Sequence, residues 1–351
     1  MAFQDFLWTA ERTVNALITG GSGFLGTHLA RALVAGGHQV TALVRPASDC
    51  RELTALDIAL VQGDVTVPAS LTPAVAGSDV VFHLAGLVKA FNQAEFLRVN
   101  EEGTRNVAEA AASRTTPPVL VAVSSLAAAG PSPNGRARTE LDPPLPVSNY
   151  GRSKHAGELA ATAWAARVPL SIVRPPVVFG PRDPSMALVF RVIARRGIFA
   201  VPGRGQRRLS LIYVTDLVSA LISVAERGKR VSPGTDGDVA SANGYYYVAD
   251  DVHPTFDELG QLIGRAVGRE HIRVLHPPRL LNYGAAGASE LFSRLCRHPS
   301  IFNVDKIREM SAGSWTCAAD RIRAELGFAV TAPLEDRLRE TGDWYRRQGW
   351  L

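Results

Sequence analysis

The sequence predicts an α/β fold in which a doubly wound parallel sheet is followed by a smaller C-terminal lobe. Two observations lead to this prediction. Short runs of β-branched residues alternate with longer helical patterns over the first half, whereas after about residue 174 the alternation loosens and loops rich in Pro and Gly dominate. We expect an N-terminal extension over 1–13, the sheet domain over 14–174 and the smaller lobe over 175–351, with some lobe segments returning to the sheet.

The individual elements follow from the spacing of apolar residues. Six short runs predict the parallel strands, because an amphipathic or Ala-rich stretch separates each from the next. These runs are 14–19, 38–44, 58–62, 79–85, 119–123 and 170–174. Apolar residues at helical spacing predict helices over 24–35, 95–112, 150–166, 185–196, 214–226, 256–267 and 334–347. The triplet 245–247, three tyrosines, predicts a further short strand.

Composition narrows the class of protein. The 351 residues are 46% hydrophobic and 20% charged, which excludes a disordered chain, a coiled coil and a disulfide-stapled miniprotein. The net charge of +5 is carried by scattered arginines, so nucleic-acid binding is not indicated. The three cysteines show no pairing or metal-ligand spacing, and we expect no metal. Without a signal-peptide pattern or an apolar run of roughly 18 residues, the sequence predicts a cytoplasmic protein with no membrane-spanning segment.

The segment TGGSGFLG, residues 19–26, joins the first predicted strand to the first predicted helix. Glycines there let the backbone turn tightly and approach a pyrophosphate, and the helix N-terminus supplies free N–H groups and a partial positive charge. A glycine pattern alone could be no more than a tight turn. Its place between strand and helix predicts a Rossmann-type dinucleotide site in which Gly20, Gly23, Phe24, Leu25 and Gly26 bind the cofactor.

The ends of the next two strands bear on which dinucleotide binds. The second strand ends in Arg45, with no Asp or Glu to hold a ribose 2′-hydroxyl, and a cation there favours a 2′-phosphate. NADP(H) is therefore favoured, with support from the nearby Ser48 and with NAD(H) as the alternative; a solvated strand-end charge is the other interpretation of Arg45. Asp64, followed by Val65, is placed either to accept from the adenine amino group or to form an Asx turn.

A Tyr-x-x-x-Lys pair predicts the chemistry. Only four lysines occur in the chain, and Lys154 stands four residues after Tyr150, which puts both side chains on one helix face. A neighbouring ammonium stabilises a phenolate, so we expect Lys154 to lower the pKa of Tyr150 and to reach the nicotinamide ribose. Ser125 follows a predicted strand 25 residues before Tyr150, where its hydroxyl can hold the reacting oxygen.

Together these motifs resemble the extended short-chain dehydrogenase/reductase family, also called the NAD-dependent epimerase/dehydratase family. The resemblance runs through nearly the whole chain, from TGGSGFLG through HLAG at residue 83, VNEEGTRN at 99, VSSLAAAG at 123 and YGRSKHAGE at 150 to RPPVVFGP at 174. It implies that Ser125, Tyr150 and Lys154 are catalytic. It also implies that Asn100 supports the active-site helix and a proton relay, a plain helix cap being the alternative.

The resemblance further implies a set of cofactor contacts and a branch of the family. Leu84, Ala85 and Gly86 would line the cofactor, and Pro175 would lie beside the nicotinamide. The chain lacks the acidic pair of the sugar-nucleotide dehydratases, having Leu-Ala at 126–127, and has Leu209 where epimerases carry Arg. In motif form it is most similar to the 3β-hydroxysteroid dehydrogenase and dihydroflavonol-reductase-like branch.

These motifs predict an oxidoreductase that moves hydride between NADP(H) and a carbonyl or alcohol carbon, and the resemblance implies that the substrate is a bulky, largely apolar small molecule. Two alternatives stay open: a nucleotide-sugar epimerase that retains NAD, and a non-catalytic cofactor-sensing protein. Arg204 and Arg208 could grip a phosphate of the substrate or lie in a solvated loop. The stretch 279–308 is expected to form a lid or an interfacial helix, His83 is expected to be a packed core histidine, and a homodimer is a further expectation.

Overall fold

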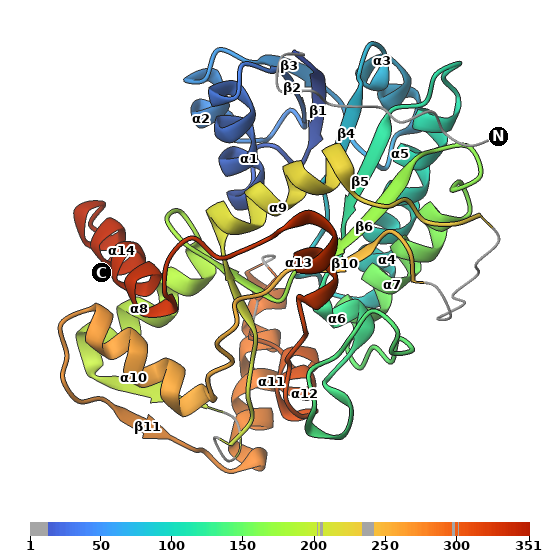
Figure 1. Cartoon of the computed structure of the whole chain (residues 1–351). Coiled ribbons are helices and arrows are strands. Elements are labelled where there is room, and N and C mark those ends of the chain that lie inside the picture. Colours follow the sequence, from blue (N-terminus) through green and yellow to red (C-terminus); the bar gives the residue numbers. More distant parts are fainter. Residues whose placement is uncertain (1–12, 202, 204–205, 234–241, 297–298, 301) are drawn as a thin grey trace.

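The central feature of the computed structural model is a seven-stranded parallel sheet (Figure 1). The described residues are 13–201, 203, 206–233, 242–296, 299–300 and 302–351. In spatial order the strands are β10 (Tyr245–Tyr247), β6 (Leu170–Arg174), β5 (Val119–Val123), β4 (Val80–His83), β1 (Asn15–Thr19), β2 (Gln39–Val44) and β3 (Ala59–Gln62). The order reverses between β1 and β4, and such a switch point opens a crevice at the carboxyl ends of the strands.

Helices cover both faces of the sheet, which is why its strands are almost continuously apolar. On one face lie α1 (Phe24–Ala35), α2 (Arg51–Thr54), α9 (Val214–Arg227) and α13 (Asp320–Leu326), packed through one buried cluster. On the other lie α3 (Leu71–Val75), α5 (Gly103–Ala112) and α7 (Asn149–Thr162), packed through a second. Between β4 and α5, the chain forms α4 (Gln93–Leu97) and the π-helical turn η2 (Arg98–Glu102).

The second half of the chain builds a separate core beside the sheet. Its buried cluster joins α8 (Pro184–Arg196), α10 (Phe256–Ala266) and α14 (Leu334–Arg347). Two small parallel pairs complete it, β7 (Val177–Phe179) with β9 (Leu211–Tyr213) and β8 (Ile198–Ala200) with β11 (Arg273–Leu275). Near the lower end of the sheet lie α6 (Leu126–Ala129), α11 (Arg279–Leu295) and α12 (Val304–Ser311), whereas β10 returns to pair with β6 (Figure 1).

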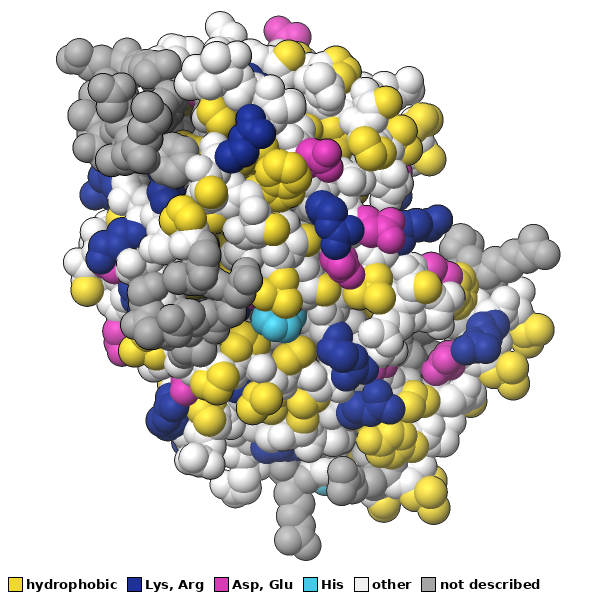
Figure 2. Space-filling view, turned by 90° about the vertical axis from the view of Figure 1, so that its right-hand side faces the viewer, with side chains coloured by type: hydrophobic (Ala, Val, Ile, Leu, Met, Phe, Trp, Pro, Cys, Tyr) yellow, Lys and Arg dark blue, Asp and Glu magenta, His cyan; other side chains and the backbone are white. Residues whose placement is uncertain are grey.

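The predicted fold class is confirmed, and each of the six predicted strands is found within a residue or two of its expected bounds. The single helix expected over 95–112 is wrong, because the π-helical turn η2 interrupts it. The helix expected to reach residue 166 ends at Thr162. Of the expected N-terminal extension, only Thr13 is among the described residues. Figure 2 shows Lys and Arg side chains scattered among acidic ones over one face of the molecule, without a single basic patch.

Candidate active site

The glycine-rich turn between β1 and α1 borders the crevice at the switch point. Gly20 has a φ of +73°, and a Cβ there would lie 2.8 Å from the backbone nitrogen of Ala85. At Gly26 a Cβ would lie 2.3 Å from the carbonyl oxygen of Gly20. The N-cap of α1 is Gly23, which offers no side-chain cap, and no acidic residue stands in the first turn. Backbone N–H groups at the start of α1, including Phe24 and Leu25, therefore remain for an anion.

The loop after β4 lies directly against this turn. The Thr19 hydroxyl accepts from the backbone nitrogen of Ala85 at 3.2 Å and pairs with His83 Nδ1 at 2.7 Å. His83 Nε2 pairs with Thr104 Oγ1 at 2.9 Å, and burial lowers the pKa of His83 to about 3. His83 is thus a neutral core histidine, as expected. It fixes where the loop of Leu84, Ala85 and Gly86 leaves the sheet, facing the glycine-rich turn.

The ends of β2 and β3 lie on the opposite side of the glycine-rich turn. Arg45 follows β2 with an exposed side chain, and its backbone nitrogen donates to Ser48 Oγ at 3.1 Å. Asp64 Oδ1 accepts from the backbone nitrogen and hydroxyl of Thr66, both at 2.8 Å, which is an Asx turn. Val65 is buried, and its carbonyl oxygen accepts from Asn106. The turn interpretation of Asp64 is therefore confirmed, while its contact with adenine stays a prediction.

Asn100 lies in the π-helical turn and joins two parts of the site. Its Nδ2 donates to the carbonyl of Leu87 at 3.0 Å and to Ser153 Oγ at 2.9 Å, and its Oδ1 accepts from the backbone nitrogen of Leu87 at 2.7 Å. Asn100 is buried, and a Cβ on Gly86 would lie 3.1 Å from its Oδ1 and 3.5 Å from Lys154 Nζ. Asn100 therefore holds the loop after β4 against α7, rather than acting as a plain helix cap.

Ser125, Tyr150 and Lys154 come together where β5 ends and α7 begins. Ser125 is the N-cap of α6, its Oγ accepts from the backbone nitrogen of Ala127 at 3.1 Å, and its side chain hydrogen-bonds with that of Tyr150. Tyr150 stands in the first turn of α7, with its ring centroid 6.0 Å from that of Phe96. Lys154, one turn later, donates from Nζ to the carbonyl of Val123 at 2.7 Å. A hydroxyl, a phenol and an ammonium thus lie at the same end of β5 and α7.

The electrostatics of this group correct one expectation. Lys154 does not lower the pKa of Tyr150; burial raises the pKa of Tyr150 to about 12, with a further increase from Glu309 and a decrease from the Ser125 hydrogen bond. The reason is that the Lys154 ammonium is directed to a backbone carbonyl rather than to the phenol. Burial also lowers the pKa of Lys154 to about 8, although Glu158 opposes this shift. The phenol of Tyr150 and the amine of Lys154 therefore both favour their neutral forms more than the Tyr-x-x-x-Lys spacing alone indicates.

A buried ion pair also holds α7, the helix that carries Tyr150 and Lys154. Arg174 donates to Glu158 from Nε at 2.8 Å and from Nη2 at 2.6 Å, a bidentate pair that keeps the Glu158 carboxylate ionised and its pKa low. Glu158 stands four residues after Lys154 on the same helix face. Pro175, which follows β6, is buried, and its carbonyl accepts from the backbone nitrogen of Leu126 at 2.9 Å. Spacing along α7 could have singled out Glu158 from the sequence.

Two carboxylates from α12 reach the start of α7, and sequence reasoning missed both. Asp305 Oδ2 accepts from the backbone nitrogen of Asn149 at 2.7 Å, and Glu309 Oε2 accepts from Ser148 Oγ at 2.7 Å. Ser148 is itself the N-cap of α7. Acidic groups near a helix N-terminus are stabilising. Because these partners lie more than 150 residues apart, no local pattern in the sequence indicates them.

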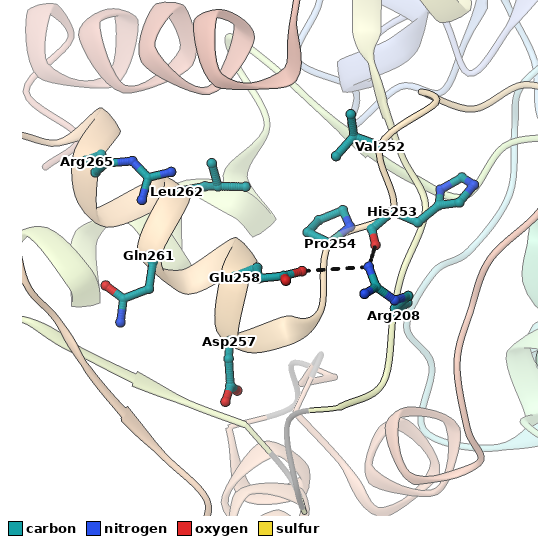
Figure 3. Close-up of a pocket in the computed structure, with 9 residues that line it drawn as sticks. All are labelled: Arg208, Val252, His253, Pro254, Asp257, Glu258, Gln261, Leu262 and Arg265. Atoms are coloured by element: carbon teal, nitrogen blue, oxygen red, sulfur yellow. Dashed lines mark hydrogen bonds and ion pairs between the residues drawn. The ribbon is translucent and has the colours of Figure 1, made fainter. Parts of the chain in front are cut away.

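The arginines proposed to grip the substrate are placed differently. Arg204 lies outside the described residues. Arg208 lines a hollow of about 660 Å³ beside α10, where it donates to the carbonyl of His253 at 2.8 Å and lies 3.8 Å from Glu258 (Figure 3). None of Ser125, Tyr150 and Lys154 lines this hollow. A role for Arg208 in substrate binding stays a prediction, and the structure does not bring it together with the catalytic candidates there.

Comparisons with known proteins agree with this architecture. Residues 16–240 match the model of the NAD-dependent epimerase/dehydratase family. The chain is 34% identical over 335 residues to the ceramide reductase of Caulobacter vibrioides, covering 95% of both chains. It is 28% identical over 349 residues to the sterol demethylase protein B of Methylococcus capsulatus, covering 96% of this chain and all of the relative. The UDP-glucose 4-epimerase of Thermotoga maritima, 20% identical, has the same fold with a TM-score of 0.75, covering 95% and 99% of the two chains.

The fold, the glycine-rich turn and the extent of these matches define the class. This chain belongs to the NAD-dependent epimerase/dehydratase family of extended short-chain oxidoreductases, and it is an enzyme that depends on a nicotinamide dinucleotide. Among the described residues, no helix is long and apolar enough to cross a membrane.

Proposed function

We propose that this enzyme uses NADP(H) to reduce a ketone on a large, mainly apolar molecule to the alcohol. The observation that carries the proposal is the convergence of Ser125, Tyr150 and Lys154 next to the loop after β4, because carbonyl reduction needs an oxygen-binding hydroxyl and a proton donor at one place. Their geometry supports these roles, and turnover measurements are the test.

The residues at the switch point fit a dinucleotide. The turn at Gly20 and Gly26 leaves no room for a Cβ, so its backbone can approach a ligand closely. It leads into the N-terminus of α1, which has no side-chain cap and therefore suits a pyrophosphate. Arg45, for which no ion pair is found among the described residues, would hold the 2′-phosphate of NADP(H). Leu84, Ala85, Gly86 and Pro175 would line the rest of the cofactor. When bound, the nicotinamide cofactor supplies the hydride.

The protein's own part in the reaction is proton transfer and orientation. Ser125 would hold the carbonyl oxygen by a hydrogen bond, and Tyr150 would give its phenolic proton to that oxygen as the alcohol forms. The raised pKa of Tyr150 keeps the phenol protonated and ready to donate at neutral pH. Lys154 would position the nicotinamide ribose, while Asn100 holds the loop after β4 and α7 in register.

Apolar character of the substrate is supported by two arguments. Leu126 and Ala127, where dehydratases of this family carry an acidic pair, are both buried, and so is Leu209, where epimerases carry Arg. The relatives with the names ceramide reductase and sterol demethylase protein B are named after lipids. We therefore propose a ketone on a lipid-like molecule as the substrate, in preference to a sugar nucleotide.

The test is an assay of the purified chain with long-chain keto-lipids in detergent and with UDP-sugars, following nicotinamide absorbance with NADPH and with NADH. We expect oxidation of NADPH with a keto-lipid, and no net redox change or epimer with UDP-sugars. Epimerisation of a UDP-sugar with no turnover of ketones would overturn the proposal in favour of a nucleotide-sugar epimerase. Tight NADPH binding without turnover of any ketone or sugar would favour a cofactor-sensing protein.

The proposal also includes the cellular compartment and the oligomeric state of the enzyme. The three cysteines, Cys50, Cys296 and Cys317, are free thiols, which suits a reducing compartment such as the cytoplasm. Dimerisation stays a prediction, and sedimentation of the purified chain tests it.

A further inference from the structure

Helix α11 has its polar and apolar sides reversed relative to an ordinary surface helix. Its most exposed side chains are apolar and recur at helical spacing, and their exposed fractions are Leu280 83%, Leu281 64%, Leu291 64%, Phe292 67% and Leu295 75%. In contrast, Asn282 and Ser293 are buried on the side that faces the protein. Asn282 Nδ2 donates to the carbonyl of Pro277 at 2.8 Å. The helix therefore presents a continuous apolar stripe to its surroundings.

Such a stripe is costly in water and marks a site of interaction. Other exposed leucines of the described chain, such as Leu141 and Leu188, stand without an apolar stripe of this length around them. The helix has 17 residues, which corresponds to about 25 Å and is too short and too interrupted by small and polar residues to span a bilayer. Its geometry is that of a helix that lies in an interface.

The charge of the sequence around α11 indicates which kind of interface the helix binds. Residues 271–311 contain six Lys and Arg but three Asp and Glu, so this stretch provides most of the chain's net positive charge. Each of the three carboxylates is paired within the stretch, Glu290 with Arg294, Asp305 with Arg308 and Glu309 with Lys306. Arg273, just before α11, is exposed. An apolar stripe in a stretch of the sequence with a net positive charge is complementary to an anionic lipid surface.

We propose that α11 is an interfacial helix that binds the surface of an anionic lipid bilayer. Helix α11 packs against α12. Asp305 and Glu309 of α12 in turn hold the start of α7, which carries Tyr150, so α12 links α11 to the helix of the candidate active site. Binding to lipid does not depend on the proposed reaction, so the two proposals can fail separately.

The test measures binding of the full chain to vesicles by co-sedimentation. One set of vesicles contains phosphatidylcholine alone and the other contains added phosphatidylglycerol. We expect binding to the anionic vesicles that weakens as salt rises, because screening removes the electrostatic part. In the double variant Leu281→Gln/Phe292→Gln we expect binding to fall by at least about tenfold, because two buried apolar side chains are lost from the interface.

The matched control is Leu188→Gln/Val192→Gln, which removes two exposed apolar side chains from α8 and should bind vesicles like the unaltered chain. Unfolding temperature and NADPH binding of both variants verify that they fold. The proposal is overturned if the unaltered chain binds neither vesicle, or if the α11 variant binds as well as the control. It is also overturned if the chain forms a dimer that only the α11 variant abolishes and shows no lipid binding, because the stripe is then covered by a second copy. Turnover of a short, water-soluble ketone, measured alongside, tests the proposed reaction independently of lipid.

Discussion

The two sides of the candidate site are held together in different ways. On the cofactor side, the glycine-rich turn is built from near neighbours, with Gly23 donating to Gly20 at 3.0 Å and Thr27 donating to Gly23 at 3.0 Å. On the catalytic side, α7 is held at its start by Asp305 and Glu309 of α12, from the far end of the chain. The difference indicates that the shape of the glycine-rich turn depends mainly on neighbouring residues, whereas the placement of Tyr150 depends on a distant part of the chain. Substitutions on the two sides should therefore affect different measurements.

The largest expected effect is on the catalytic side. Tyr150→Phe removes the proposed proton donor and keeps the ring, so turnover should fall by about 10² to 10⁴. NADPH affinity should remain nearly unchanged, since the glycine-rich turn is untouched. Initial rates with the keto-lipid substrate and a binding titration with NADPH check both parts.

Tyr245→Phe is the matched control, because it also removes one phenolic hydroxyl, from the first residue of β10. It should retain most of the activity. If Tyr150→Phe turned over at the rate of this control, Tyr150 would not be the acid/base.

A second substitution disturbs the cofactor side alone. In Gly26→Ala the new methyl group would lie 2.3 Å from the carbonyl oxygen of Gly20, so the turn must shift, at a cost of about 1 to 3 kcal/mol. Unfolding by urea should show this loss, and NADPH binding should weaken with it. In Gly284→Ala of α11 the methyl group meets open space, so the same exchange should stabilise the helix by up to about 1 kcal/mol. Equal stability of the two variants would show that the turn relaxes freely.

The strand, turn and helix on the cofactor side are also the part whose structure could be predicted from sequence. Its signal is local: glycines at fixed spacing, between a strand and a helix, and a strand end that carries Arg45. The four-residue spacing of Tyr150 and Lys154 is local in the same sense, and α7 does present both residues to one place. The parallel sheet covered by helices followed from apolar periodicity, because burial on both faces leaves continuous apolar strands, whereas the order of the strands came from the structure.

What could not be predicted depends on distant partners. The π-helical turn at Asn100 forms where this residue bonds to Leu87 and Ser153, and helical periodicity alone gives no sign of it. The expectation that Lys154 lowers the pKa of Tyr150 was wrong because spacing does not reveal the Val123 carbonyl that the ammonium binds. The roles of Asp305 and Glu309 needed the docking of α12.

A smaller effect should separate the two nicotinamide cofactors. If Arg45 pairs with the 2′-phosphate, Arg45→Ala removes a charge-assisted hydrogen bond worth about 1.5 to 3 kcal/mol, or roughly one to two decades of affinity for NADPH. NADH affinity should stay almost constant. The control is Arg51→Ala, a nearby exposed arginine already paired with Asp49. Equal losses for both cofactors, or tighter native binding of NADH, would leave Arg45 as a surface charge only.

The smallest effect concerns Lys154, which touches both sides of the site. Its pKa of about 8 means that the ammonium loses its proton as pH rises above that value. A bound ribose would accept hydrogen bonds from the charged form and raise its pKa, so NADPH affinity should be constant below about pH 8. Above it, affinity should fall by up to about tenfold per pH unit, until the pKa of the complex is reached.

Fluorescence titrations of NADPH binding across this pH range measure that slope. In Lys154→Arg the side chain stays charged throughout, so the decline should disappear even if absolute affinity changes. The comparison also identifies the titrating group, because a decline that persists in Lys154→Arg would have to come from a group other than Lys154. A flat profile in the unaltered enzyme would show that the Lys154 ammonium contributes nothing to holding the cofactor.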